Sequence, residues 1–178
     1  MFNKIFTRFL FLLFLSNCCV LNAYEITVEK VGDIGQIAIP LAAAALSAGK
    51  QDYEGLKVLA YTSALTLSSV YALKYSIDAK RPYGGRHSFP SGHTAGAFMG
   101  ASYLQRRYGW TYGVPAYAAA SFVGYSRVKA RKHFTRDVLG AACIALGTNY
   151  LLTKPYENAT LAPVVTEEGI GIQFDISI

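Results

Sequence analysis

The stretch FPSGHTAGAF, residues Phe89 to Phe98, places Pro, Ser, Gly and His at the start of an apolar run that predicts a helix. Ser91 suits the capping position, because its hydroxyl can accept a hydrogen bond from a backbone N–H of the first helical turn. The free N–H groups of that turn attract anions, and His93 lies within reach of the same anion. An ordinary helix cap with an exposed histidine is the alternative. The stretch therefore predicts a helix start and, beside it, a candidate anion site.

Apolar segments with helical spacing lie on both sides of this stretch. We expect helices over residues 34–49, 53–77, 93–109, 113–130 and 135–153. These segments are rich in Ala, Gly, Ser and Thr, which permit close helix contacts in a soluble bundle and in a membrane alike. The polar residues within 53–77 favour a soluble or peripheral bundle over membrane-spanning helices.

Two segments, residues 24–30 and residues 161–178, alternate apolar and polar residues, as strands do. Residues 24–30 predict a short strand, and residues 161–178 predict a β-hairpin whose apolar face packs on the helices and pairs with that strand. The predicted fold class is all-α: a compact bundle of about five to six helices with these strands appended. We expect one domain over residues 24–178, with its helical core over 31–153.

Residues 1–23 have the regional order of a secretory signal peptide. Lys4 and Arg8 precede an apolar stretch, and small and polar residues follow it. We expect cleavage after Ala23 and export to the bacterial cell envelope. An uncleaved anchor and a lipid anchor at Cys18 are the alternatives. Cys143 is the cysteine that the mature chain would keep, so no internal disulfide is expected.

The composition favours an anionic partner. The chain of 178 residues is 52% apolar and 16% charged, with a net charge of +6, and most of the positive excess lies between Lys74 and Arg136. Phosphate or an acidic membrane surface would suit this charge. No basic ribbon interleaved with aromatic residues appears, so nucleic acid is not an expected partner. No cluster of residues has metal-ligand spacing, so no metal is expected.

Two further polar clusters flank the Ser-Gly turn. In KYSIDAKRP, Lys74 and Arg81 are seven residues apart, so two helical turns place them on one side. The alternative is a helix that simply ends in basic residues. In SRVKARKHFTRD, His133 lies four residues before Asp137, which can accept a hydrogen bond from one imidazole nitrogen. The other nitrogen would then be bare and nucleophilic, unless the two form an ordinary surface pair.

Together, the three clusters resemble the motifs of the type 2 phosphatidic acid phosphatase superfamily, which also includes bacterial class A acid phosphatases and vanadium haloperoxidases. The residues that match are Lys74, Arg81, Pro82, Pro90, Ser91, Gly92, His93, Ser126, Arg127, His133 and Asp137. The resemblance implies a helical core and hydrolysis of phosphate esters with neither metal nor cofactor.

The resemblance also implies a role for each site residue. The phosphate-binding residues are Lys74, Arg81, Ser91, Gly92 and Arg127. His133 would attack phosphorus and form a phosphohistidine, with Asp137 orienting it. His93 would protonate the leaving oxygen and then activate water. Such a reaction depends mainly on charge stabilisation and in-line positioning.

The expected function is that of a phosphomonoesterase on the periplasmic side of the envelope. A lipid phosphate or pyrophosphate at the membrane surface is the expected substrate, because the chain is apolar and its motifs are rimmed with basic residues. Arg86 and His87, in the loop between the first two motifs, are candidates for contact with a headgroup. A secreted acid phosphatase for soluble esters is the alternative. A vanadate-dependent haloperoxidase is a further one, disfavoured by the short chain. The oligomeric state is left open.

Overall fold

The computed structural model describes residues 27–156, 160–166 and 169–175, with side chains over 27–156. The first helix is described over Thr27–Gly49. The helices that follow are α2 (Tyr53–Ile77), α3 (Gly92–Tyr108), α4 (Trp110–Lys129) and α5 (Thr135–Leu152). Within the described part these five helices form the core, which confirms the predicted all-α class. The predicted leader over 1–23 lies outside the described residues.

The predicted strand over 24–30 is wrong where the structure describes it, because residues 27–30 form the first turn of the first helix. Val28, Ile39 and Ala43 are all buried, and their spacing places them on one face of a helix. A short alternation of β-branched residues is a weak signal that packing along such a face overrides.

Two strands lie near the C-terminal end of the chain. β1 (Thr160–Thr166) pairs antiparallel with β2 (Gly169–Asp175), and the sheet consists of these two strands. The predicted pairing with residues 24–30 is therefore wrong for residues 27–30, which are helical. Residues 176–178 lie outside the described part of the chain. The packing of the hairpin's apolar face on the helices stays a prediction.

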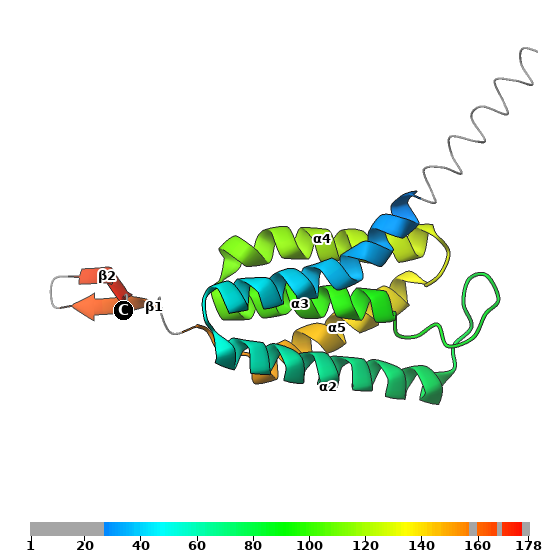
Figure 1. The fold of residues 1–178 in the computed structure, drawn as a ribbon, viewed down its shortest axis with the longest axis horizontal. Helices are drawn as coiled ribbons and strands as arrows, with labels where there is room; N and C mark the ends of the chain where they lie inside the picture. The colour runs from blue at the N-terminus through cyan, green and yellow to red at the C-terminus, as the bar shows by residue number, and fades with distance from the viewer. Residues whose placement is uncertain (1–26, 157–159, 167–168, 176–178) are drawn as a thin grey trace, which may run out of the picture.

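α3 is the central helix of the bundle. Figure 1 shows it between the first helix and α4 on one side and α2 and α5 on the other. Tyr103 and Ala101 of α3 are fully buried, and Met99 is nearly so. α3 begins within the stretch FPSGHTAGAF, residues 89–98, and the start of this helix lies among the ends of its neighbours.

The first helix packs closely against α3 and α4 at two glycines. A Cβ atom on Gly100 would lie 2.7 Å from the backbone nitrogen of Pro40, and one on Gly32 would overlap the hydroxyl of Ser126. The absence of these side chains lets the helices approach at both crossings. As a result, Asp33 is brought to the end of α4.

A buried ion pair fixes the turn between the first helix and α2. Asp52 is 4% exposed, and its two oxygens accept hydrogen bonds of 2.6 and 2.7 Å from the guanidinium of Arg107 on α3. Tyr108 donates a third hydrogen bond of 2.8 Å. Burial by itself would raise the pKa of Asp52, but the hydrogen bonds outweigh it and hold this pKa below its usual range.

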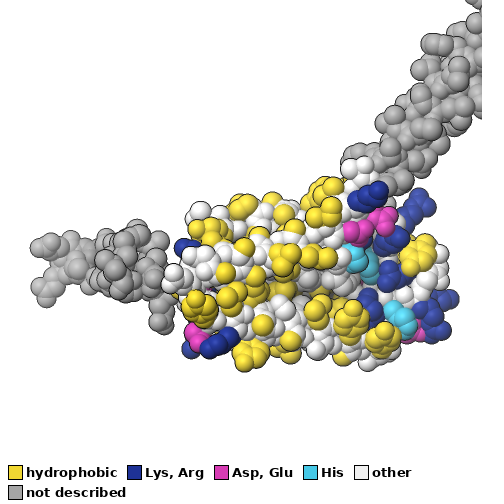
Figure 2. Space-filling view, in the orientation of Figure 1, with side chains coloured by type: hydrophobic (Ala, Val, Ile, Leu, Met, Phe, Trp, Pro, Cys, Tyr) yellow, Lys and Arg dark blue, Asp and Glu magenta, His cyan; other side chains and the backbone are white. Residues whose placement is uncertain are grey.

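Charged and apolar side chains are segregated on the surface. Figure 2 shows hydrophobic side chains along the flanks of the bundle and a gathering of Lys, Arg, Asp, Glu and His at one end. Exposed apolar residues include Ile34, Leu41, Tyr61 and Tyr71. Two described helices, Thr27–Gly49 and α2, are long and apolar enough to cross a membrane, judged by length and composition alone.

Candidate active site

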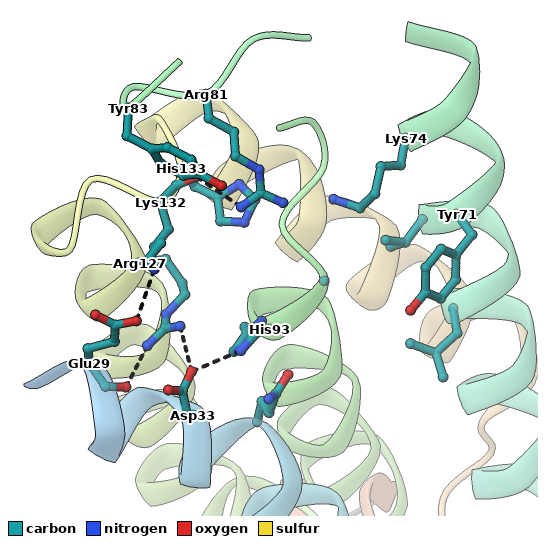
Figure 3. A pocket seen from close by; sticks show the side chains of 14 residues that line it. Glu29, Asp33, Tyr71, Lys74, Arg81, Tyr83, His93, Arg127, Lys132 and His133 are labelled. Carbon is teal, nitrogen blue, oxygen red and sulfur yellow. Dashed lines mark hydrogen bonds and ion pairs between the residues drawn. The ribbon is translucent and has the colours of Figure 1, made fainter. Parts of the chain in front are cut away.

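A cavity of about 540 Å³ opens at the charged end of the bundle, and Figure 3 shows its lining. Six predicted site residues line it: Lys74, Arg81, Gly92, His93, Arg127 and His133. They come from α2, from the loop after it, from the start of α3 and from the region where α4 leads into α5. The fold thus brings together segments that are up to 59 residues apart in the sequence, counted from Lys74 to His133.

Two of the three cations are held by backbone carbonyl groups. The ammonium of Lys74, in the last turn of α2, donates hydrogen bonds of 3.0 Å to the carbonyl of His87 and 2.8 Å to that of Pro90. The Nε of Arg81 donates one of 3.1 Å to the carbonyl of Arg86. These hydrogen-bond partners carry no net charge, so both positive groups can stabilise an anion in the cavity.

The third cation, Arg127, is 3% exposed and is bound by the first helix. Its two terminal nitrogens donate hydrogen bonds of 2.6 Å to Oδ1 of Asp33 and 2.6 Å to the backbone carbonyl of Glu29. Its Nε donates one of 3.1 Å to the hydroxyl of Ser126. The guanidinium is therefore rigidly placed beside the cavity.

His133 lies in the loop between α4 and α5 and is 4% exposed. Its burial and the positive charges of Arg81 and Lys74 lower the pKa of His133 to about 4. The imidazole is therefore neutral at physiological pH, which is the form that can act as a nucleophile.

Asp137 is fully buried beside His133, but the predicted hydrogen bond between them is not formed in this structure. His133 Nδ1 and Asp137 Oδ2 are 3.6 Å apart. The same carboxylate oxygen accepts hydrogen bonds from the hydroxyl of Ser88 and, at 2.9 Å, from the backbone N–H of Phe134. Asp137 thus also caps the start of α5.

His93 stands in the first turn of α3, on the opposite side of the cavity. Its Nε2 lies 3.0 Å from Oδ1 of Asp33. Burial and the positive charge of Arg127 lower the pKa of His93, and the Asp33 carboxylate opposes them. The two histidines therefore have unlike surroundings, as a nucleophile and a proton donor require.

Ser91 and Gly92 differ in their placement. Gly92 lines the cavity, whereas Ser91 is fully buried and caps α3. The hydroxyl of Ser91 accepts hydrogen bonds of 3.4 Å from the N–H of Thr94 and 3.0 Å from its hydroxyl. The structure therefore shows the predicted helix cap, and its contact with phosphate stays a prediction.

Arg86 and His87, the candidates for contact with a headgroup, do not line the cavity. Arg86 forms an ion pair with Asp78, and Nδ1 of His87 lies 3.0 Å from Oδ1 of the same carboxylate. The ring of His87 packs against that of Tyr75, with 4.9 Å between centroids. These contacts stabilise the loop after α2.

The acidic residues of the cavity are not among those that the sequence pattern predicts. Glu29 and Asp33 of the first helix both line it, and Glu29 pairs with Lys132 at 3.3 Å. Two acids four residues apart fall on one face of a helix, so this signal required residues 27–33 to be predicted as helical. Within the described residues, no group of three or more His, Cys, Asp or Glu side chains is placed to hold a metal ion.

A helical bundle that sets two histidines among three cations around one cavity defines an enzyme that acts on phosphate groups. The family model of the PAP2 superfamily matches residues 55–160. The chain belongs to this superfamily, and it is a phosphatase.

Two relatives with similar sequences are named as lipid A phosphatases. It is 32% identical over 149 residues to a lipid A 4'-phosphatase of Helicobacter pylori, covering 77% of this chain and 75% of that one. It is 36% identical over 126 residues to a lipid A 1-phosphatase of Porphyromonas gingivalis, covering 58% of this chain and 28% of that longer protein.

Two crystal structures share the fold. That of Aquifex aeolicus LpxE superposes with a TM-score of 0.63 at 25% identity, covering 71% of this chain and 83% of the other. That of a transmembrane PAP2 type phosphatidylglycerolphosphate phosphatase from Bacillus subtilis gives 0.57 at 25% identity, covering 74% of each.

Proposed function

We propose that this phosphatase removes a phosphate group from a lipid headgroup of the lipid A type at the cell envelope. The cavity carries this proposal, because cations line one part of it and apolar residues of α2 line another. Leu67, Val70 and Tyr71 precede Lys74 on the same helix and also line the cavity. The names of the relatives support a lipid substrate, and the exposed apolar flanks of the bundle suit a membrane surface.

The proposed reaction has two steps. The positive charges of Lys74, Arg81 and Arg127 bind the non-bridging phosphate oxygens and stabilise the charge of the transition state. The Nε2 of His133, the ring nitrogen remote from Asp137, attacks phosphorus as the bond to the leaving oxygen breaks.

The result is a phosphohistidine and a lipid alcohol. His93 gives its proton to the leaving oxygen, then takes one from the water whose oxygen displaces His133 from phosphorus. Asp137 stabilises the charged form of His133 during both steps.

We also propose that residues 1–23 direct export and that the mature chain, residues 24–178, acts on the periplasmic side. N-terminal sequencing of the chain purified from cells, combined with fractionation into periplasm and membrane, tests this. A first residue at Tyr24 is expected. An intact Met1 or a lipid on Cys18 would contradict cleavage after Ala23.

The substrate is tested by phosphate release from a panel of esters in one detergent. The panel comprises lipid A phosphates, phosphatidate, phosphatidylglycerol phosphate, undecaprenyl pyrophosphate and glycerol phosphate. Release from lipid A phosphates at the highest kcat/KM is expected. Preference for glycerol phosphate would favour a phosphatase for soluble esters instead.

The nucleophile is tested by substitution. His133→Ala is expected to abolish phosphate release, because the residual transition-state stabilisation lacks a group to attack phosphorus. A folded His133→Ala variant that keeps its activity would refute the phosphohistidine.

A further inference from the structure

Asp33 occupies the gap between Arg127 and His93 on the wall of the cavity (Figure 3). One oxygen, Oδ1, lies 2.6 Å from a terminal nitrogen of Arg127 and 3.0 Å from Nε2 of His93. The residue lies outside the segment 55–160 that the family model matches. The first helix thus adds a carboxylate to a site whose predicted members all lie in later segments.

The position of Asp33 is fixed from two directions. Gly32 brings the first helix against Ser126 of α4, so closely that a Cβ atom at this position would overlap the Ser126 hydroxyl. One turn earlier, the backbone carbonyl of Glu29 accepts a hydrogen bond of 2.6 Å from Arg127. With the backbone held at both points, the carboxylate of Asp33 is aimed at His93.

Charged groups of both signs surround the ring of His93. Facing the ring are Arg127 from α4 and Arg81 from the loop after α2, and both cations disfavour a protonated ring. The other charged or titratable residues that line the same cavity are Glu29, Lys74, Tyr71, Tyr83, Lys132 and His133. Asp33 supplies the carboxylate in contact with the ring, so it favours the protonated form of His93 and opposes the burial and the two positive charges, which together hold the pKa of His93 below its usual range.

We propose that Asp33 is the positioning residue of the general acid, holding one N–H of protonated His93 so that the other N–H faces the leaving oxygen. This inference rests on the proposed function. When the bond between phosphorus and the leaving oxygen breaks, the proton on Nδ1 moves to that oxygen, and Nε2–H stays on Asp33. The neutral ring then presents the bare Nδ1, which takes a proton from the attacking water in the second step.

A poor leaving group depends on the acid far more than a good one does, because an alkoxide must be protonated as it departs. The full-length chain and its Asp33→Asn variant are therefore assayed in one detergent on phosphatidate, an alkyl phosphate, and on p-nitrophenyl phosphate. We expect kcat/KM to fall by about 10²-fold or more on phosphatidate and less than about 10-fold on p-nitrophenyl phosphate. A merely structural role of Asp33 would lower both rates by the same factor, and that result would overturn the inference.

Glu29→Gln is the matched control, because it removes a carboxylate from the same face of the same helix without touching His93. We expect the ratio of its two rates to equal that of the unaltered chain, whatever its effect on each rate. A ratio shifted as in Asp33→Asn would overturn the inference, because it would show a general effect of charge. If Asp33→Asn fails to fold, Asp33→Ser is measured in its place with the same expectations.

Coupling to His93 completes the test. The double variant Asp33→Asn/His93→Asn is expected to be no slower on phosphatidate than His93→Asn alone, since the two residues act as one unit. A further loss beyond that of His93→Asn would overturn the inference. Failure of the unaltered chain on both esters and on lipid A phosphates would instead count against the proposed function.

Discussion

His133 lies beside Asp137 without a hydrogen bond, since 3.6 Å separates Nδ1 of the imidazole from Oδ2 of the carboxylate. That oxygen is engaged by the hydroxyl of Ser88 and the backbone N–H of Phe134. The carboxylate that orients the proposed nucleophile is therefore itself held in place by the loop before α3 and by the start of α5.

Ser88→Ala tests this support. Ser88 is fully buried, and its loss leaves a buried carboxylate with one donor fewer. We expect the free energy of unfolding to fall by about 1–3 kcal/mol, measured in detergent. Ser76→Ala is the control, because Ser76 donates a comparable hydrogen bond from an exposed position, and its effect should stay within about 0.5 kcal/mol. Equal effects of the two variants would contradict the assigned support.

The unlike pKa values of the two histidines predict an acidic optimum. His133 must be neutral to attack and has a pKa of about 4, while His93 must be protonated and has a pKa below 6.5. The kcat/KM profile, corrected for ionisation of the substrate phosphate, should fall on the acid side near pH 4 and on the alkaline side below pH 6.5.

The same profile reports on Asp33. Its carboxylate raises the pKa of His93, so Asp33→Asn should lower that pKa and move the alkaline limb to lower pH, leaving the acid limb in place. An alkaline limb that stays where it is in Asp33→Asn would contradict the assignment of His93 as the acid.

Gly32→Ala should separate the first helix from α4. The added Cβ would overlap the hydroxyl of Ser126 and lie 2.8 Å from a terminal nitrogen of Arg127. We expect a loss of stability of about 1–3 kcal/mol and a higher KM, because Arg127 shifts from the cavity. Gly147→Ala, where a Cβ meets no atom within 4 Å, is the control and should be neutral or stabilising by about 0.5–1 kcal/mol. An unchanged KM in Gly32→Ala would contradict the prediction.

The buried pair of Asp52 and Arg107 predicts how stability depends on pH. Asp52→Asn leaves the Arg107 charge uncompensated, so the free energy of unfolding should fall by about 3–5 kcal/mol at neutral pH. The pKa of Asp52 lies below 3.8 in the folded chain, so its contribution is present above pH 3.8 and is lost as the pH falls through the lower folded value. Thermal unfolding of both chains from neutral pH downward should show their difference shrinking. A constant difference would count against the pair as its source.

Sequence spacing predicted most of the helical core, and for α2 it gave the bounds that the structure shows, Tyr53–Ile77. Spacing also singled out Lys74, Arg81, His93 and His133, and the resemblance to the phosphatase superfamily added Arg127. The fold places these residues around one cavity. The motifs are recognisable because each is a short continuous segment of the chain, and the third extends from the end of α4 to the start of α5.

Spacing could not reveal contacts between distant helices. Asp33 and Arg127 are 94 residues apart, and only the crossing of the first helix over α4 brings them together. The alternation of residues 24–30 predicted a strand, so the helical face that Glu29 and Asp33 share was not predicted. Ser91 shows a second limit of prediction from sequence. A serine at this position suits both a helix cap and an anion ligand, and the local pattern does not tell which way its hydroxyl points.

α2 fixes the distance between the ammonium of Lys74 and the apolar side chains of Leu67 and Tyr71. Seven residues of helix rise by about 10 Å, so the cation stands at a set height over the apolar wall of the cavity. Suppose that the hydrocarbon of a lipid substrate packs on α2. A scissile phosphate much nearer to the acyl chains, or much farther from them, would then lie out of reach of Lys74, Arg81 and Arg127. On the proposed function, we expect the length of the headgroup, as much as its charge, to decide which esters are cut.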